Sequence, residues 1–109
     1  MYVYRVEHKD PSIQYGPYQC GVAMKPHLYD DDHPSPLQSG IEMERDDFSC
    51  FVRNDDLTKW FKNSDITDFR KYGFDIFRFE VKADDVKLGD KQAAFKKARA
   101  FKRERVTVH

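Results

Sequence analysis

The stretch FDIFRFEVK, residues 74–82, is the most regular part of the sequence. Phe77, Phe79 and Val81 alternate in it with charged residues, and this period of two is typical of a β-strand. Residues 2–7 show a similar alternation, in residue types that favour strands. We therefore predict strands at residues 2–7 and 74–82.

Two short helices and a further strand are predicted between these two. The apolar run at residues 48–52 indicates an inner strand. The first helix uses Asn54 or Asp55 as its N-cap, and its apolar face is made of Leu57, Trp60 and Phe61. The second helix begins at Ser64 and ends at Gly73, because glycine readily adopts the left-handed conformation that closes a helix.

The C-terminal part allows two interpretations. One is a continuous helix, since four apolar residues recur at helical spacing: Ala94, Phe95, Ala98 and Phe101. The other is a turn at Gly89-Asp90, a strand at residues 92–95 and a short helix after it. Residue propensities by themselves favour the helix.

These elements predict an α+β fold, with a small, mainly antiparallel sheet covered by two or three short helices. A chain of 109 residues is long enough for a single domain, residues 1–109. The expected core consists of Tyr4, Val6, Phe48, Phe51, Leu57, Trp60, Phe61, Phe69, Phe74, Ile76, Phe77 and Phe79.

Composition excludes several classes of protein. Aromatic residues make up 15% and the formal net charge is +0, whereas disordered chains have few aromatics and a large net charge. No apolar run approaches the roughly 20 residues that span a bilayer, and Met1 leads into Tyr2-Val3-Tyr4-Arg5 without the pattern of a signal peptide. Two cysteines suit a reducing compartment. We expect a cytoplasmic protein that does not bind membranes.

Charge is distributed unevenly along the chain. Residues 91–109 hold seven basic residues against Glu104, a charge of +6, so residues 1–90 carry -6. The two parts could attract each other or different partners. One hypothesis is that this basic C-terminal segment binds nucleic acid, with its cations on phosphates and Phe95 and Phe101 stacked on bases.

The Pro-rich acidic loop, residues 25–47, is the first candidate for a binding surface. A loop of this length in a small domain is often functional. Aromatic side chains anchor protein interfaces, and charges steer partners towards them. The candidate protein-binding residues are Tyr15, Tyr18, Tyr29, Asp30, Asp31, Asp32, Glu42 and Glu44.

A metal site is not predicted. Cys20, His27, His33 and Cys50 provide the ligand types that zinc prefers, but they lack the usual zinc-site spacing. The acidic residues also lack the spacing of a calcium-binding loop. The metal hypothesis therefore rests on ligand types alone.

Arg5 is a candidate ligand-binding residue. If it faces inwards from its strand, it needs a carboxylate or an anionic ligand, because a buried guanidinium keeps its charge. Glu7 or Glu80 could form a structural pair with it. The alternative partner is the phosphate of a nucleotide.

The sequence resembles a family of small, uncharacterised proteins of tailed bacteriophages and prophages. The resemblance rests on Tyr4-Arg5-Val6-Glu7, Gly16-Pro17-Tyr18, the Trp60-Phe61 helix, Tyr72-Gly73-Phe74 and Lys91-Gln92-Ala93-Ala94-Phe95. It implies an accessory role in infection, such as takeover of host machinery or inhibition of a host defence.

Val3-Tyr4-Arg5 followed by Asp10-Pro11 is also similar to mono-ADP-ribosyltransferases of the pertussis-toxin type. That resemblance implies binding of NAD, with Arg5 on the phosphates and Ser49 and Gln92 at corresponding strand positions, and it favours a strand at residues 92–95. The catalytic glutamate of that family is missing, so transferase chemistry would be severely impaired.

The function predicted from the sequence is that of a phage accessory protein that binds a host protein without catalysis or cofactor, such as an anti-CRISPR-like inhibitor of host defence. The first alternative is a nucleotide-binding protein that uses Arg5, Ser49 and Gln92, with NAD as its ligand. The second is nucleic-acid binding through residues 91–109.

Overall fold

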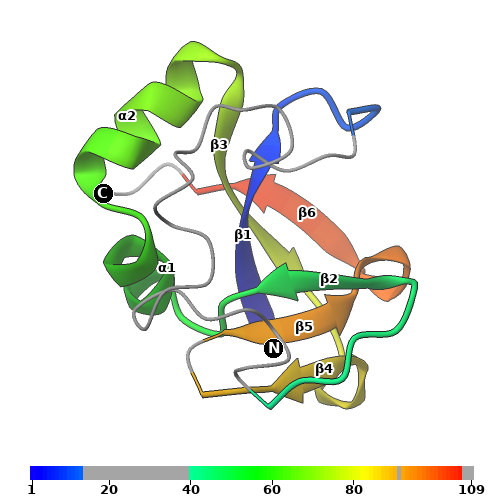
Figure 1. Ribbon diagram of the computed structural model, residues 1–109. Helices are drawn as coiled ribbons and strands as arrows, with labels where there is room; N and C mark the ends of the chain where they lie inside the picture. Colours follow the sequence, from blue (N-terminus) through cyan, green and yellow to red (C-terminus); the bar gives the residue numbers. More distant parts are fainter. Residues whose placement is uncertain (14–39, 91, 107–109) are drawn as a thin grey trace.

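The computed structural model describes residues 1–13, 40–90 and 92–106 (Figure 1). The α-helices are α1 (Asn54–Trp60) and α2 (Asn63–Lys71), and short 3-10 helices cover Ala83–Asp85 and Lys97–Arg99. The strands are β1 (Tyr2–His8), β2 (Asp47–Cys50), β3 (Phe74–Glu80), β4 (Val86–Leu88), β5 (Ala93–Lys96) and β6 (Lys102–Arg105).

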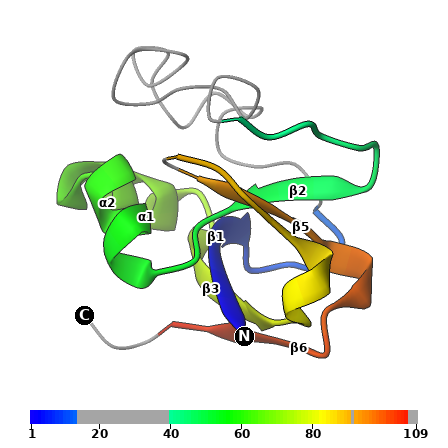
Figure 2. The ribbon, with the colours of Figure 1, turned by 90° about the horizontal axis from the view of Figure 1, so that it is seen from below.

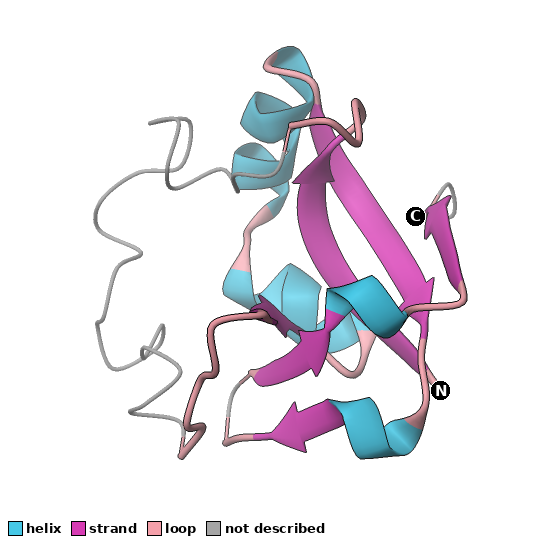
Figure 3. Cartoon of the chain, turned by 90° about the vertical axis from the view of Figure 1, so that its right-hand side faces the viewer, coloured by secondary structure: helices cyan, strands magenta, loops and turns pink. Residues whose placement is uncertain are grey.

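The strands form two antiparallel sheets of three strands each. Sheet A has the order β1-β3-β6 and sheet B the order β2-β5-β4. Figures 1 and 3 show that the strands of sheet B run across those of sheet A. Backbone hydrogen bonds of 2.7 and 2.8 Å between Tyr4 and Phe51 join the two sheets. The predicted α+β class is confirmed, with two sheets where the sequence suggested one.

The central strand β3 is buried on both faces. Phe74 and Ile76 pack in one apolar cluster with residues of α1 and α2. Phe77 and Phe79 point to the opposite face and pack in a second cluster with Phe95 of sheet B. Figure 2 shows sheet A and sheet B one above the other, with both helices at one side. The stretch at residues 74–82 therefore holds the two clusters together.

Most of the predicted core is confirmed, with two exceptions. Tyr4 and Phe48 are only half-buried and pack at the margins of the two clusters. Val3 shares one side of β1 with the charged residues Arg5 and Glu7, yet it is fully buried because sheet B covers that face. The core also contains seven residues outside the expected list, namely Ile41, Cys50, Ile66, Val81, Ala93, Ala94 and Phe95.

Both predicted helices are present, with different starts. Arg53, rather than Asn54 or Asp55, is the N-cap of α1, and it makes no side-chain capping bond. The second helix starts at Asn63, where Asp65 accepts a 3.0 Å hydrogen bond from the Lys62 amide. Leu57 and Trp60 are buried as expected from their spacing.

Gly73 ends the second helical segment, as predicted, with φ of 89°. A Cβ at this position would lie 2.5 Å from Nε2 of His8, whose ring packs against Phe74. The variant Gly73→Ala should therefore lose more than the about 1–2 kcal/mol that a left-handed residue other than glycine costs. Urea unfolding measures this loss.

Gly40 provides the matched control, since it has φ of 84° and nothing within 4 Å of an added Cβ. Gly40→Ala should show the backbone cost alone. If Gly73→Ala and Gly40→Ala lose equal stability, the His8 ring does not contribute.

The C-terminal part follows the second of the two interpretations. Residues 93–96 form β5, the middle strand of sheet B, and the helix after it is a 3-10 turn of three residues. The strands β4 and β6 were not predicted, because β4 has only three residues and all four residues of β6 are charged. Phe95 is fully buried, whereas Phe101 is 61% exposed. Pairing on both sides of β5 thus outweighs the helical propensity of this segment.

Candidate functional site

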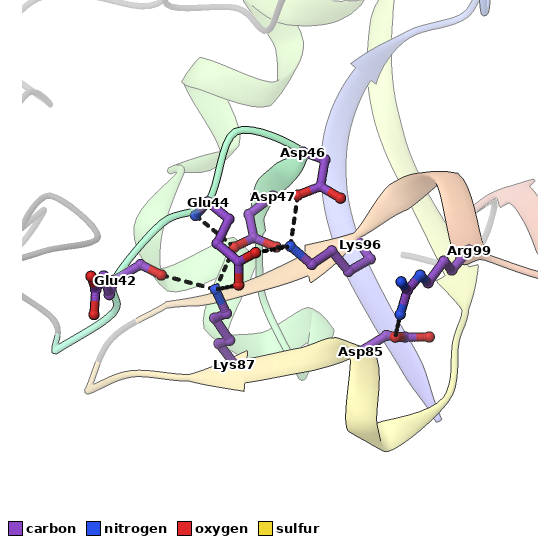
Figure 4. A network of polar contacts seen from close by, with 8 residues as sticks. All are labelled: Glu42, Glu44, Asp46, Asp47, Asp85, Lys87, Lys96 and Arg99. Carbon is purple, nitrogen blue, oxygen red and sulfur yellow. Dashed lines mark hydrogen bonds and ion pairs between the residues drawn. The ribbon is translucent and has the colours of Figure 1, made fainter.

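The acidic segment, defined here as residues 42–47, is fixed onto sheet B by two lysines (Figure 4). Lys87 of β4 donates to Oδ2 of Asp47 at 2.7 Å, to Oε1 of Glu44 at 2.9 Å and to the Glu42 carbonyl at 3.0 Å. Lys96 of β5 lies 2.8 Å from Oδ1 of Asp47 and 2.7 Å from Oδ1 of Asp46. Asp47 is therefore held from both sides, and its side chain is only 1% exposed.

Electrostatics explains why a carboxylate is tolerated at Asp47. Burial would raise its pKa, but hydrogen bonds from Lys87 and Lys96 outweigh this and lower the pKa from 3.8 to about 2. The same contacts raise the pKa of each lysine. The charged form of Asp47 is thus part of the folded structure at neutral pH.

The depressed pKa predicts a contribution of Asp47 to acid stability. Its stabilising effect is complete above the unfolded pKa of 3.8 and disappears as the pH falls through the folded pKa of about 2. Partial solvent screening limits the whole effect to about 1–2 kcal/mol. Urea unfolding at about pH 5 and about pH 3 should show a smaller acid-induced loss for Asp47→Asn than for the wild type. Equal losses in both proteins would contradict the assignment.

The acidic segment also leaves charges open to solvent. Side chains of Glu44 and Asp46 are 63% and 64% exposed, and Figure 4 shows the Glu42 carboxylate away from both lysines. Met43, which lies between Glu42 and Glu44 in the chain, is 38% exposed. Of the predicted protein-binding residues, the structure thus places Glu42 and Glu44 on one fixed surface. Tyr15, Tyr18, Tyr29 and Asp30 to Asp32 lie outside the described residues.

A second buried carboxylate, Glu7, lies on sheet A among three cations. We call Arg5, Glu7, Lys97 and Arg103 the Glu7 cluster. Glu7 accepts from Nε of Arg5 at 2.9 Å and from Nε of Arg103 at 3.1 Å, and Nζ of Lys97 is 2.6 Å from it. Burial would raise the pKa of Glu7, but the hydrogen bond from Lys97 and the charge of Arg5 lower it below its ordinary value.

Arg5 faces inwards, with a side chain that is 13% exposed, and its structural partner is Glu7 rather than Glu80. Its Nη1 also donates to the Ser49 carbonyl at 2.7 Å and lies 3.4 Å from the Ser49 hydroxyl. The structure thus brings Arg5 and Ser49 together. Gln92 is buried just before β5.

The basic C-terminal segment is largely ion-paired with the earlier part of the chain. The buried Asp75 carboxylate forms ion pairs with Arg105 and Arg70, at nitrogen–oxygen distances of 2.6 and 3.2 Å. Asp85 forms an ion pair with Arg99 at 3.0 Å. Lys96, Lys97 and Arg103 contact the acids described above. The opposite charges of the two parts of the sequence therefore attract each other within the fold.

Cys50 is buried and has no thiolate character. Burial raises the pKa of its thiol to about 12, so the group is protonated at neutral pH and is a poor nucleophile. Among the residues that the structure describes, no cluster of His, Cys, Asp and Glu could hold a metal ion. The other three residues of the metal hypothesis, Cys20, His27 and His33, fall in the part of the chain that is not described.

A family model described as the Bacteriophage T4 Y00F protein matches residues 1–109. The chain belongs to this family of bacteriophage proteins. No curated protein and no solved structure matches it. The expected resemblance to phage proteins is thus confirmed for the family, whereas nothing in these comparisons supports the resemblance to mono-ADP-ribosyltransferases.

No described helix of this phage protein has the length and apolar character needed to cross a membrane.

Sequence reasoning did not find the lysines that fix the acidic segment. Lys87 and Lys96 are 40 and 49 positions from Asp47 in the chain, and no local motif joins them. The only signal was the opposite charge of the two parts of the chain. It indicated that acidic and basic residues attract each other, but it did not indicate which residues pair.

Proposed function

We propose that this phage protein acts by binding a host protein, without catalysis, and that it inhibits a host defence in the manner of an anti-CRISPR protein. Membership of a phage family supports an accessory role in infection. The observation that carries the proposal is the fixed acidic segment, which exposes Glu42, Glu44 and Asp46 around Met43.

The fixed position of these charges favours binding. A surface ordered before the partner arrives loses less conformational freedom on association. Exposed carboxylates raise the association rate with a basic partner surface, and Met43 adds apolar contact area. The partner that this surface fits is a host protein with a basic docking surface.

Affinity purification from host lysate with quantitative mass spectrometry tests the proposal. The informative variant is Glu42→Lys with Met43→Ala, since both side chains are exposed and the lysine contact uses only the Glu42 carbonyl. Asp68→Lys on α2 is the matched control, with the same change of charge at a side chain that is 58% exposed.

A host protein retained by the wild type and by Asp68→Lys, but lost in the double variant, would support this surface. Equal retention by all three would exclude it. Neutralising Asp30 to Asp32 should then slow association with the identified partner in a salt-dependent way, because charge steering is screened by salt. An unchanged association rate would exclude that part of the loop.

The nucleotide alternative has a separate test. Arg5 is already paired with Glu7 and Ser49, so a nucleotide phosphate would have to displace or join these contacts. NAD or ADP-ribose that binds the folded state should raise the thermal midpoint. A rise that is absent in Arg5→Ala would favour the nucleotide alternative over protein binding. No rise at millimolar ligand would exclude it.

A further inference from the structure

Three exposed apolar side chains gather at one end of sheet A. Met1, Tyr2 and Phe101 are 44%, 38% and 61% exposed. Backbone bonds of 2.8 Å join Met1 to Val81, and Tyr2 pairs with Glu80. The Phe101 amide donates to the Glu80 carbonyl at 2.8 Å. We call this end of the sheet the Tyr2–Phe101 surface.

The two aromatic rings lie on opposite sides of the central strand. Tyr2 belongs to β1 and Phe101 directly precedes β6, and both strands pair with β3. Two strand spacings separate the outer strands by about 10 Å. The rings are therefore far enough apart to contact different parts of an extended ligand.

Cations accompany both rings. The Arg78 guanidinium lies 4.6 Å from the centroid of the Tyr2 ring, and Nζ of Lys82 lies 6.0 Å from that of Phe101. Arg78 is held in place by Glu104. Lys102, next to Phe101 in the chain, has a side chain that is 60% exposed. Each ring thus has a positive charge beside it.

Sheet A as a whole carries a surplus of positive charge. Its strands contain five cations and four carboxylates, and Arg70 and Lys97 are ion-paired with those carboxylates. The surplus is therefore three charges. Two of them belong to the buried Glu7 cluster, so the cations near the Tyr2–Phe101 surface are Arg78, Lys82 and Lys102. The five strand cations are Arg5, Arg78, Lys102, Arg103 and Arg105. Among them, Lys102 on the edge strand β6 is 60% exposed and lies on the same face as Tyr2, whereas Arg105 lies on the opposite face and is ion-paired with Asp75.

We propose that the Tyr2–Phe101 surface binds single-stranded nucleic acid. Exposed aromatic rings provide platforms for bases, and the cations around them attract the phosphate backbone. Tyr2 and Phe101 stack on bases, while Lys102 and Lys82 contact phosphates. This differs from the sequence-based hypothesis, in which Phe95 was a stacking residue, because Phe95 is fully buried.

Fluorescence anisotropy with labelled single-stranded DNA and RNA of about 12 nucleotides tests the proposal on the full chain. At about 50 mM salt, Phe101→Ala should weaken binding at least about fivefold, the lower end of the effect of one stacked base. Leu88→Ala is the matched control, since Leu88 is a large apolar side chain, 70% exposed, on sheet B. It should leave binding unchanged.

The phosphate contacts have their own readout. Lys102→Ala and Lys82→Ala should each weaken binding and reduce the dependence of affinity on salt by about one charge. Arg53→Ala, which removes a cation at the N-cap of α1 with a side chain 71% exposed, should do neither. Thermal unfolding of each variant confirms that the fold is kept.

Three results would overturn the proposal. They are no binding of either nucleic acid by the wild type at about 50 mM salt, equal losses in Phe101→Ala and Leu88→Ala, and equal salt dependence in Lys102→Ala and Arg53→Ala. The first result would leave an acidic protein as the partner of this surface. None of the three would affect the test of the acidic segment, which uses other residues.

Discussion

Replacing Glu7 with glutamine should destabilise the protein by about 3–5 kcal/mol, the usual effect of removing one member of a buried ion pair. The substitution keeps the shape of the side chain and removes its charge. Arg5, Lys97 and Arg103 would then face each other without their shared carboxylate, and the side chains of all three are at least three-quarters buried. Urea unfolding at neutral pH measures the loss.

Glu104→Gln is the control for this prediction. Glu104 also lies between two cations, Arg78 and Lys102, but it is on the open part of sheet A with 28% of its side chain exposed. Water can solvate its partners once the charge is removed, so the loss of stability should be small. Similar losses for Glu7→Gln and Glu104→Gln would show that the Glu7 cluster is not a structural centre.

Replacing Phe95 with alanine should also cost about 3–5 kcal/mol, the range for a fully buried phenylalanine. Phe95 is 0% exposed, and its ring lies 5.1 Å from the Phe79 ring, tilted by 49°. Phe79 belongs to sheet A and Phe95 to sheet B, so this contact joins the two sheets. The resulting cavity should also lower the thermal midpoint.

Phe101→Ala gives the contrasting result within the same segment. Phe101 is 61% exposed, so its loss should change the stability by less than about 0.5 kcal/mol, as is usual for surface substitutions. The pair therefore separates a residue of the core from a residue of the proposed binding surface. A large loss in Phe101→Ala would contradict the placement of its side chain.

The candidate surfaces were only partly predictable from the sequence. For Arg5 the sequence left three partners open, Glu7, Glu80 or a nucleotide phosphate, and the structure pairs it with Glu7. The contribution of Lys97 and Arg103 was not expected, because these residues are 90 and 96 positions from Glu7. Glu42 and Glu44 were identified as an acidic surface, but nothing in their neighbourhood indicated that Lys87 and Lys96 would hold it.

The sequence by itself determined the local elements with strong periodicity. Alternation predicts β1 and β3, and the spacing of Leu57 and Trp60 predicts α1, because these patterns depend only on which side chains share a face. Gly73 likewise marks the end of a helix through its own backbone freedom. The α+β class follows from these elements.

Only the tertiary structure decided how many sheets form and which residues meet between them. Residues 93–96 have helical propensity, yet they form the middle strand of sheet B because β2 and β4 pair with them on both sides. Sheet B then covers the face of sheet A that carries Val3 and Glu7, which buries both residues. Burial of Glu7 in turn requires the cations of the C-terminal segment, since an unpaired charge is too costly in the interior. These are contacts between distant parts of the chain, and they have no signature in local sequence.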